Sequence, residues 1–460
     1  MKKLFYILFF FVPVVVSAQF NLYKDSPLGY AWKNEGTAGF SAGEVGYTSL
    51  AFSSSGEPYV AFMDYWNNYK ATVMKFDGTN WVNVGNAGFS AGEARYTSLA
   101  FSPSDEPYIA YKDFGNSYRA TVRKFNGYSW VNVGNAGFSA GEVLYTSLAF
   151  SQSGQPYVAF EDAGHSLKAT VMKFNGTSWI NVGSAGFSPR QIEYTSLAFS
   201  PSGQPYIAFE DYGNYSKATV MNFDGTNWIN IGPSGGFSPK GAFYICLAFS
   251  PSGQPYVAFA DGANLSRATV MQFDGTNWIN VGNADFSQAE ANYITLAFSP
   301  SGQPYVAYSD WGTNGNATVK RFDGQNWITV GSACFSKGTA SSTSLAFSLS
   351  GEPYVAFVDD GNDDKATVMK YDSVFVGVND LHESKLLLYP NPAIDRITIE
   401  TSAIPTQSQL SITNLNGQQL ITRQITGPKT QIDISSLPGG VYFVRVLGER
   451  TVEVGKFVKQ

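Results

Sequence analysis

Short apolar segments recur along most of the chain, and each is bounded by Gly, Pro, Asn, Asp or Ser. In one stretch they cover 97–102, 107–112, 119–125 and 130–134 and are rich in Val, Ile, Phe, Tyr or Thr. Runs of this kind between turn residues predict β-strands. The first two segments are apolar or small on both faces, whereas the last two include polar residues. We therefore expect the first pair to be buried and the last pair to reach the surface.

This four-segment unit repeats in steps of 49 residues, with one step of 50. The copies begin at Tyr47, Tyr96, Tyr145, Tyr194, Tyr244, Tyr293 and, in a degraded form, Ser342. Links of hairpin length join the segments within a copy, which predicts an antiparallel meander, and a longer link leads to the next copy. A period of about 40 to 50 residues with this connectivity is typical of propeller blades. The pattern predicts an all-β chain with a seven-bladed β-propeller.

Two segments compete for the outermost strand of the last copy. The segment 31–44 contains Trp32 and matches a fourth strand with its following link, but no first three strands precede it. The last copy lacks the tryptophan of its own fourth strand. Pairing the Trp32 segment with the last copy would complete seven units and close the ring by hydrogen bonds. The alternative is that 373–378 supplies this strand and leaves Trp32 free.

The first residues indicate export. Two lysines precede an apolar run from Leu4 to Val16, and small residues follow up to Ala18. This pattern is typical of a secretory signal peptide, and the run is too short to span a bilayer. We therefore expect 1–18 to be a signal peptide, 19–378 to be the propeller, and the mature chain to have no transmembrane segment.

The charge of the chain bears on which classes of partner it can bind, and its cysteine content bears on whether it forms a disulfide. The 460-residue chain has a formal net charge of -6 and no basic block, so we expect no binding to nucleic acid, which requires clustered Lys and Arg. The only cysteines, Cys246 and Cys334, fall at non-equivalent points of different repeats. We expect no disulfide between them, because the repeat geometry would hold them in different units.

The composition changes after Asp380, where apolar segments alternate with Asn-Gly and Pro-Gly-Gly turns. This pattern predicts a linker at 379–384 and a small Ig-like β-sandwich at 385–460. The last segment resembles the type A C-terminal sorting domain of the type IX secretion system through Tyr389, Pro390, Asn391, Pro392, Gly417, Asp433, Leu437, Gly439, Gly440, Tyr442, Lys456 and Lys459. The resemblance implies passage through the periplasm, handling by the type IX machinery through 385–460, and release or anchoring at the outer cell surface.

The repeats resemble WD, kelch and Asp-box blades only loosely, which supports the fold and transfers no catalytic residue.

The link between the second and third segments varies most among copies, so we expect any specific binding on the propeller face that carries these links. Each link begins with an aspartate and has Lys or Arg six residues later in six copies. The aspartates are Asp64, Asp113, Asp162, Asp211, Asp261, Asp310 and Asp359. They form a ring of ligand-binding carboxylates in one interpretation. In the other interpretation, each carboxylate caps its own turn and pairs with the Lys or Arg six residues later.

Two of these links carry further candidate chemistry. Asp359, Asp360, Asp363 and Asp364 lie within six residues, which suggests a calcium site, although the spacing fits no EF-hand and a solvated acidic turn is the alternative. No other cofactor is expected. Tyr65, Trp66 and Tyr69 in the first link and Trp311 in the sixth are aromatic candidates for stacking on sugar rings, or for packing over neighbouring loops.

The long links share one phenylalanine, which we expect to plug the space between blades. These residues are Phe40, Phe89, Phe138, Phe187, Phe237, Phe286 and Phe335.

The sequence offers little for catalysis. With only His165 and His382 present, no Ser/His/Asp or metal-histidine group can be drawn. Near-identical repeats supply the same residue seven times, whereas an enzyme site needs unlike residues in unlike roles. The leading hypothesis is a secreted or surface-bound, non-catalytic propeller that binds a glycan or a protein. The alternatives are a secreted glycan hydrolase or lyase, whose carboxylate pair need only be close in space, and a purely structural, adhesin-like surface protein.

Overall fold

The computed structural model describes residues 29–374, 386–401, 408–414, 418–425, 427–447 and 452–460. Contacts divide the chain into two compact units, one of which ends at Val374 and the other of which contains the C-terminal strands. The expected signal peptide at 1–18 and linker at 379–384 lie outside the described residues. Among the described residues, no helix has the length and apolarity to cross a bilayer.

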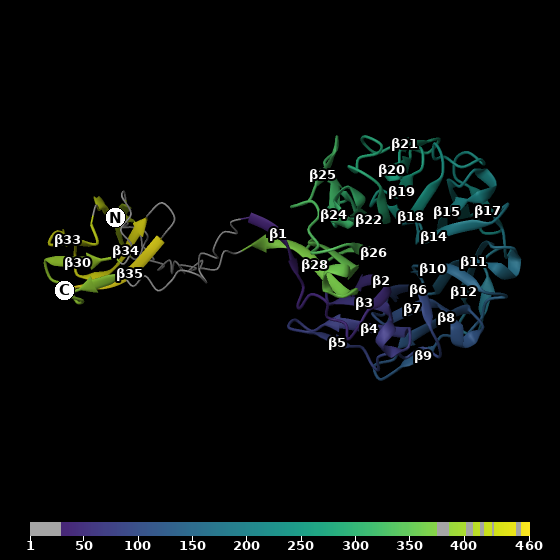
Figure 1. Cartoon of the computed structure of the whole chain (residues 1–460), viewed down its shortest axis with the longest axis horizontal. Helices are drawn as coiled ribbons and strands as arrows, with labels where there is room; N and C mark the ends of the chain where they lie inside the picture. The colour runs from purple at the N-terminus through teal and green to yellow at the C-terminus, as the bar shows by residue number, and fades with distance from the viewer. Residues whose placement is uncertain (1–28, 375–385, 402–407, 415–417, 426, 448–451) are drawn as a thin grey trace, which may run out of the picture. The chain divides into compact units, whose positions relative to one another are not determined.

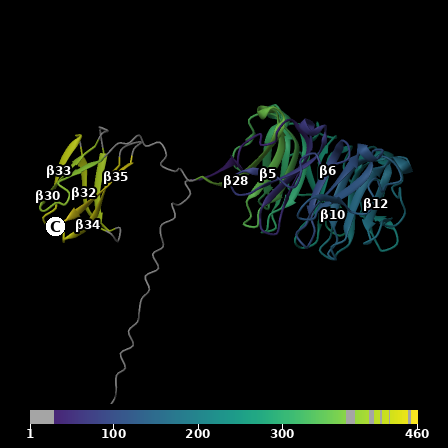
Figure 2. The same cartoon turned by 90° about the horizontal axis from the view of Figure 1, so that it is seen from below.

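Residues 29–374 form seven antiparallel four-stranded sheets set around a common centre (Figure 1). Seen after a quarter turn, neighbouring sheets lie side by side around this ring (Figure 2). In six of the sheets the strand order follows the chain order, as predicted for a meander, and in the seventh the N-terminal strand takes the outermost place. The all-β propeller prediction is confirmed.

The first four blades consist of the following strands. Blade 1 contains β2 (Val45–Phe52), β3 (Pro58–Asp64), β4 (Lys70–Phe76) and β5 (Trp81–Asn83). Blade 2 contains β6 (Ala94–Phe101), β7 (Pro107–Asp113), β8 (Arg119–Phe125) and β9 (Trp130–Asn132). Blade 3 contains β10 (Val143–Phe150), β11 (Pro156–Asp162), β12 (Lys168–Phe174) and β13 (Trp179–Asn181). Blade 4 contains β14 (Ile192–Phe199), β15 (Pro205–Asp211), β16 (Lys217–Phe223) and β17 (Trp228–Asn230).

The remaining blades follow the same plan. Blade 5 contains β18 (Ala242–Phe249), β19 (Pro255–Asp261), β20 (Arg267–Phe273) and β21 (Trp278–Asn280). Blade 6 contains β22 (Ala291–Phe298), β23 (Pro304–Asp310), β24 (Asn316–Phe322) and β25 (Trp327–Thr329). Blade 7 contains β26 (Ala340–Phe347), β27 (Pro353–Asp359), β28 (Lys365–Val374) and β1 (Gly29–Asn34). Short 3-10 turns follow the second strand in six blades: η1 (Tyr65–Asn67), η2 (Phe114–Asn116), η3 (Ala163–His165), η4 (Tyr212–Asn214), η5 (Trp311–Thr313) and η6 (Asp360–Asn362).

The N-terminal strand closes the ring. Strand β1 pairs antiparallel with β28, with Trp32 opposite Tyr371 and Gly29 opposite Val374. The alternative in which 373–378 forms the outer strand fails for the described part of that segment, because Ser373 and Val374 continue β28 itself. The closure therefore joins the two ends of the propeller sequence and pairs the edge of β28 that would otherwise be exposed.

An indole ring locks each blade onto its predecessor. The Nε1 of Trp81 donates to the carbonyl of Glu35 at 2.6 Å, and the Nε1 of Trp130 donates to that of Val84 at 2.7 Å. The link phenylalanines stack on these indoles, as Phe40 does on Trp81 with ring centroids 4.2 Å apart. The same stacking recurs for Phe89, Phe138, Phe187, Phe237, Phe286 and Phe335. The phenylalanines are thus the inter-blade plugs that the sequence predicted.

The innermost strands begin earlier than predicted. In blade 2 the strand starts at Ala94 rather than at position 97, because its register shifts between Arg95 and Ser98. Tyr96 lies in this bulge with a φ of 53°. A bulge adds one residue on one strand and redirects a side chain. The bulge thereby places this tyrosine at the start of the innermost strand.

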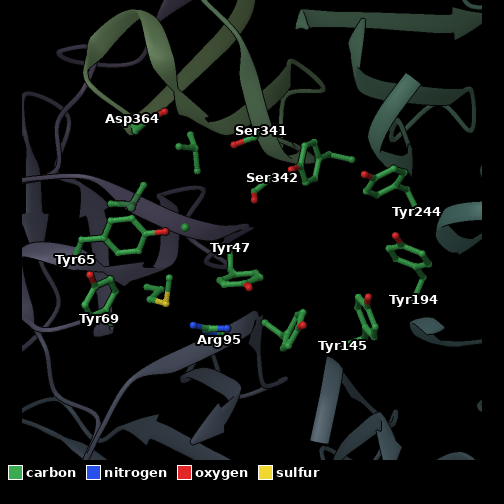
Figure 3. Close-up of a pocket in the computed structure, with 16 residues that line it drawn as sticks. Tyr47, Tyr65, Tyr69, Arg95, Tyr145, Tyr194, Tyr244, Ser341, Ser342 and Asp364 are labelled. Atoms are coloured by element: carbon green, nitrogen blue, oxygen red, sulfur yellow. The ribbon is translucent and has the colours of Figure 1, made fainter. Parts of the chain in front are cut away.

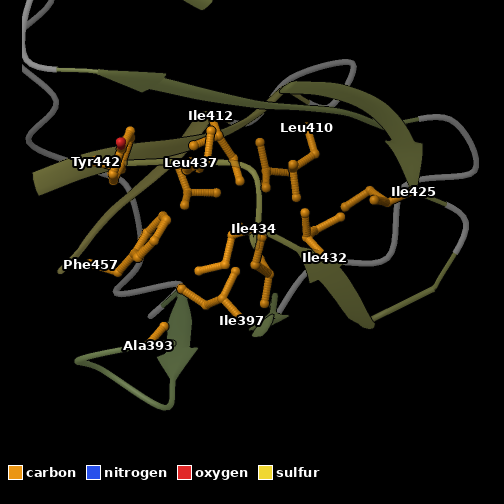
Figure 4. Packing of buried hydrophobic residues seen from close by; sticks show 13 residues of the cluster. Ala393, Ile397, Leu410, Ile412, Ile425, Ile432, Ile434, Leu437, Tyr442 and Phe457 are labelled. Atoms are coloured by element: carbon orange, nitrogen blue, oxygen red, sulfur yellow. The ribbon is translucent and has the colours of Figure 1, made fainter. Parts of the chain in front are cut away.

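The C-terminal unit has two sheets. One consists of β29 (Leu387–Tyr389), β30 (Arg396–Glu400) and β33 (Lys429–Asp433). The other has the order β32 (Gln419–Ile425), β31 (Ser408–Asn414), β34 (Gly440–Leu447) and β35 (Val452–Lys459). Thirteen buried residues from both sheets, including Ile397, Leu410 and Phe457, form its core (Figure 4).

Several residues that carry the sorting-domain resemblance have structural roles in this unit. Asn391 accepts a bond from the Val458 amide at 2.9 Å and donates to the Lys456 carbonyl at 3.0 Å, which ties the Tyr-Pro-Asn-Pro segment to the last strand. Tyr442 is buried, stacks on Phe457 and donates to the Pro438 carbonyl at 2.7 Å. Leu437 is buried, and the Asp433 carboxylate accepts the Ser435 amide at 2.9 Å. Gly417 lies outside the described residues.

Candidate functional site

A pocket of about 660 Å³ opens at the centre of the propeller, on the face that carries the links between second and third strands. Figure 3 shows its labelled side chains circling an open space. The lining residues are Val45, Gly46, Tyr47, Met63, Tyr65, Tyr69, Arg95, Tyr96, Tyr145, Tyr194, Tyr244, Tyr293, Ser341, Ser342, Val358 and Asp364. The variable links and the starts of the inner strands thus contribute to one pocket, on the face where the sequence placed any binding.

Six of these lining residues are the tyrosines that begin the repeats, and they form an almost complete ring. Adjacent rings lie close together: the centroids of Tyr47 and Tyr96 are 4.9 Å apart, and those of Tyr244 and Tyr293 are 5.2 Å apart. All six have a φ near +50°, as does Ser342 at the seventh position. Because Ser342 has a small side chain and lies beside Ser341 and Gly46, the pocket extends through this gap in the ring.

The tyrosine ring also borders a smaller pocket of about 230 Å³, which is lined by threonines next to the tyrosines in sequence. Their hydroxyls donate to carbonyls of the preceding blade, as Thr97 does to Tyr47 and Thr146 to Tyr96. Two residues further along the inner strands of blades 1 and 2, the Ser49 hydroxyl accepts the Leu99 amide at 3.0 Å. These bonds hold the inner strands together, so the tyrosines sit on a rigid base.

The ring phenols of Tyr47 and Tyr96 are neutral at physiological pH. Burial raises the pKa of Tyr96 to about 12, and burial likewise raises the pKa of Tyr47. A neutral phenol both donates and accepts hydrogen bonds and also offers an apolar ring face. The pocket can therefore contact a ligand through hydroxyl groups and aromatic faces together.

The predicted link aromatics divide into two groups. Tyr65 and Tyr69 line the pocket, with ring centroids 4.8 Å apart. Trp66 is 76% exposed and Trp311 is 51% exposed, and neither lines it. Exposed rings of this size on the same links can extend a binding surface outward from the pocket.

The seven link aspartates are buried and do not line the pocket. Asp113 accepts the Gly115 amide at 3.0 Å and the Asn116 side-chain amide at 2.8 Å. The other link aspartates also accept a backbone amide of their own turn, except Asp359, which lacks that bond. No salt bridge joins these aspartates to the Lys or Arg six residues later within 29–374. The geometry favours the capping interpretation without its ion pair.

The acidic link of blade 7 does not gather its carboxylates. Asp359 is buried and accepts bonds from Asn362 and Thr367, while Asp360, Asp363 and Asp364 are exposed. In the described part of the chain, no group of three or more His, Cys, Asp or Glu is placed to hold a metal ion. Calcium binding there stays a prediction without support from this geometry.

Sequence reasoning missed a group of charged residues near the pocket in blades 2 to 4. We call Glu142, Glu161, Glu193 and Glu210 the acidic cluster. Lys112 forms an ion pair with Glu142, and Glu193 accepts bonds from the hydroxyls of Tyr145 at 3.4 Å and Tyr212 at 3.0 Å. At the position of Lys112, Glu161 and Glu210, the other blades have Met63, Ala260, Ser309 and Val358.

Two members of the acidic cluster are deeply buried. Glu161 is 3% exposed and Glu210 is 1% exposed, and the Oε2 atom of each lacks a hydrogen-bond partner among the described residues. Burial, with Glu193 nearby, raises the pKa of Glu161 to about 8. Burial also raises the pKa of Glu210 to about 7. Perturbed carboxyl groups of this kind are typical of functional sites.

The sequence contained a signal for both the tyrosine ring and the acidic cluster. The tyrosines are the most regular mark of the repeat, but their inward placement depends on a bulge that the strand pattern does not predict. Glu161 and Glu210 appear as substitutions at one position of the second strand and Glu193 at one position of the first, whereas Glu142 occupies a link position that is also glutamate in three other links. Comparing equivalent positions across the copies, rather than reading the links alone, would have found them.

The two cysteines are free thiols. Cys246 replaces the inter-blade serine and accepts the Leu296 amide at 3.3 Å.

Comparisons with solved structures agree with the propeller. The chain resembles the lectin BP39L from Burkholderia pseudomallei with a TM-score of 0.54 and 15% identity, over 71% of this chain and 98% of the lectin. It resembles PorZ, an essential surface component of the type-IX secretion system of Porphyromonas gingivalis, with a TM-score of 0.48 and 16% identity, over 90% of this chain and 59% of PorZ. An ulvan lyase of polysaccharide lyase family PL25 matches with a TM-score of 0.48 and 12% identity, over 76% of this chain and 96% of the lyase. At 15% identity the likeness to BP39L concerns the fold alone.

The comparison with curated proteins found no match to the sequence.

The comparison with family models matches the C-terminal unit. Residues 387–460 match the family described as the secretion system C-terminal sorting domain, in agreement with the resemblance carried by the Tyr-Pro-Asn-Pro segment and the last strand. These residues are therefore a type IX secretion C-terminal sorting domain, and the protein is exported to the cell surface or beyond.

Proposed function

We propose that the propeller is a non-catalytic glycan-binding module whose primary site is the tyrosine-lined pocket. The observation that carries the proposal is the ring of six tyrosines, which is interrupted at Ser342 and joined there by Tyr65 and Tyr69. Sugars present apolar C–H faces and many hydroxyl groups. Aromatic faces and neutral phenol groups on a rigid base match both features.

The size of the pocket supports a small saccharide unit. Its volume of about 660 Å³ lies within the usual range of small-molecule sites, which is roughly 300 to 1,000 Å³. Trp66, which is exposed on the neighbouring link, would contact further units of a longer chain. Export to the cell surface or beyond brings such a site to extracellular polysaccharide.

A glycan array probed with the purified full chain tests this proposal. We expect selective hits, and we expect Trp66→Ala to weaken binding to long oligosaccharides more than to short ones. Silence on the array would contradict glycan binding and would favour a protein ligand or a purely structural adhesin-like role.

Glycan cleavage is the second candidate, because two glutamates of the acidic cluster lie in unlike environments. Glu161 is buried without a hydrogen-bonded partner at Oε2, whereas Glu193 is half-buried and accepts bonds from two tyrosine hydroxyls. Carboxyl groups whose environments differ in this way can serve as acid and base. Product release from a bound polysaccharide, abolished by Glu161→Gln and by Glu193→Gln, would establish this activity in place of the non-catalytic one.

A further inference from the structure

The acidic cluster adjoins the tyrosine-lined pocket through a shared residue. Tyr145 lines the pocket, and its hydroxyl donates to Glu193 Oε2 at 3.4 Å. Glu193 also lies directly across the strand pair from Glu210 in blade 4, and its charge contributes to the raised pKa of Glu161 in blade 3. One wall of the pocket is therefore backed by three glutamates.

The positive groups near this wall do not balance these carboxylates. Lys112 is paired with Glu142, and Arg95, which lines the pocket, is paired with Glu93. Glu161 and Glu210 form no ion pair among the described residues, and each keeps a buried oxygen without a donor. Burial raises the pKa of Glu161 to about 8 and that of Glu210 to about 7, so a ligand that supplies positive charge and N–H groups would stabilise the ionised forms of both and satisfy their buried oxygens.

The chemistry of the wall favours an organic ammonium group over a metal ion. The carboxylates do not converge on one point, since the described residues contain no cluster of three or more acidic, His or Cys groups placed to hold a metal. An ammonium group has three donors, and its hydrogen bonds to carboxylates are charge-assisted. The aromatic pocket beside it fits a sugar ring better than an extended peptide, for the reasons given above.

We infer that the tyrosine-lined pocket selects glycans that carry a free amino group, with the ammonium directed toward Glu193 and the buried glutamates Glu161 and Glu210. This inference rests on the proposed function and names its ligand class. Glu161 and Glu210 stand where blades 1, 5, 6 and 7 have apolar or small residues, so this acidic wall is confined to blades 3 and 4.

The test compares two trisaccharides that differ only in their amino groups, by titration calorimetry on the purified full chain. They are the trimer of β-1,4-linked glucosamine and its fully N-acetylated form. We expect the free amine to bind at least tenfold more tightly, and we expect added salt to reduce this difference because it screens the charge interaction. Glu193→Gln and Glu161→Gln should each reduce the preference severalfold by weakening binding of the free amine.

The control variant is Glu106→Gln, whose carboxylate pairs with Lys124 on β8 and lines no part of the pocket. It should leave the preference intact, and melting temperatures of all variants establish that they are folded. Equal binding of both trimers would overturn the inference and leave glycan binding standing. A preference that survives both glutamate substitutions, or equally tight binding of tri-lysine, would also overturn it. If no glycan binds at all, the proposed function fails together with the inference.

Discussion

Trp32 stacks on Phe335 with ring centroids 4.1 Å apart, although the two residues lie near opposite ends of the propeller sequence. The Trp32 Nε1 also donates to the Val330 carbonyl at 2.8 Å. Both contacts repeat those made by the fourth-strand tryptophan of every other blade. The first strand of the propeller thus serves as the last strand of its seventh blade.

We expect Trp32→Ala to lower the free energy of unfolding by about 3 kcal/mol, because it removes a large packed ring and the inter-blade hydrogen bond at the seam. Chemical denaturation of the full chain measures this change. Tyr128→Ala is the matched control, because Tyr128 is 91% exposed. An effect no larger than that of the control would contradict closure by the N-terminal strand.

A larger side chain at the gap in the tyrosine ring tests whether the gap is part of the binding site. Ser342 has a φ of 52°, close to the 53° of Tyr293, so a tyrosine can take the same backbone conformation there. We expect Ser342→Tyr to complete the ring, reduce the pocket and weaken glycan binding at least tenfold, while the melting temperature stays near that of the parent. Unchanged affinity in a folded variant would show that the gap is not part of the site.

The link aspartates should govern stability rather than binding. We expect Asp113→Ala to cost about 2 kcal/mol, because it removes a buried cap and leaves the Gly115 amide and the Asn116 side chain without their acceptor. Glycan affinity of the folded fraction should not change. Loss of affinity without loss of stability would restore the interpretation of these residues as a ligand-binding ring.

Glu161 should make stability depend on pH. Its pKa is raised by burial from 4.5 to about 8, so between these values the folded state holds a proton that the unfolded state has released. The stability associated with this group is therefore greatest below pH 4.5 and is lost as the pH rises through 8. We expect Glu161→Gln to stabilise the protein at pH 7 by about 1 to 3 kcal/mol and to flatten its stability profile between pH 5 and 8. Denaturation curves across this range measure the effect, and an unaltered pH profile would contradict it.

The sequence predicted the architecture well, because propeller blades depend on local and repeated features. Turn residues set the hairpins, and the position of Trp32 relative to the first complete copy indicated the closing strand. The variable links, where the pattern predicts binding, meet on the face where the pocket opens.

Sequence reasoning described the site itself less well. The inward position of Tyr96 depends on a bulge with positive φ, a conformation that strand propensity does not favour for tyrosine. The contact between Tyr145 and Glu193 joins two different blades, so no local pattern contains it. The aspartates drew attention because they recur, but recurrence in every blade reflected a shared turn geometry.

The most direct test of the account is the affinity of the full chain for a glycan identified on the array, compared with that of Tyr47→Ala. Tyr47 belongs to the ring and lies beside the gap at Ser342, so its removal takes away a stacking face without reaching the acidic cluster. We expect Tyr47→Ala to weaken binding at least tenfold, with Tyr128→Ala unchanged. Equal affinity of parent and Tyr47→Ala would contradict the assignment of the tyrosine-lined pocket as the glycan site.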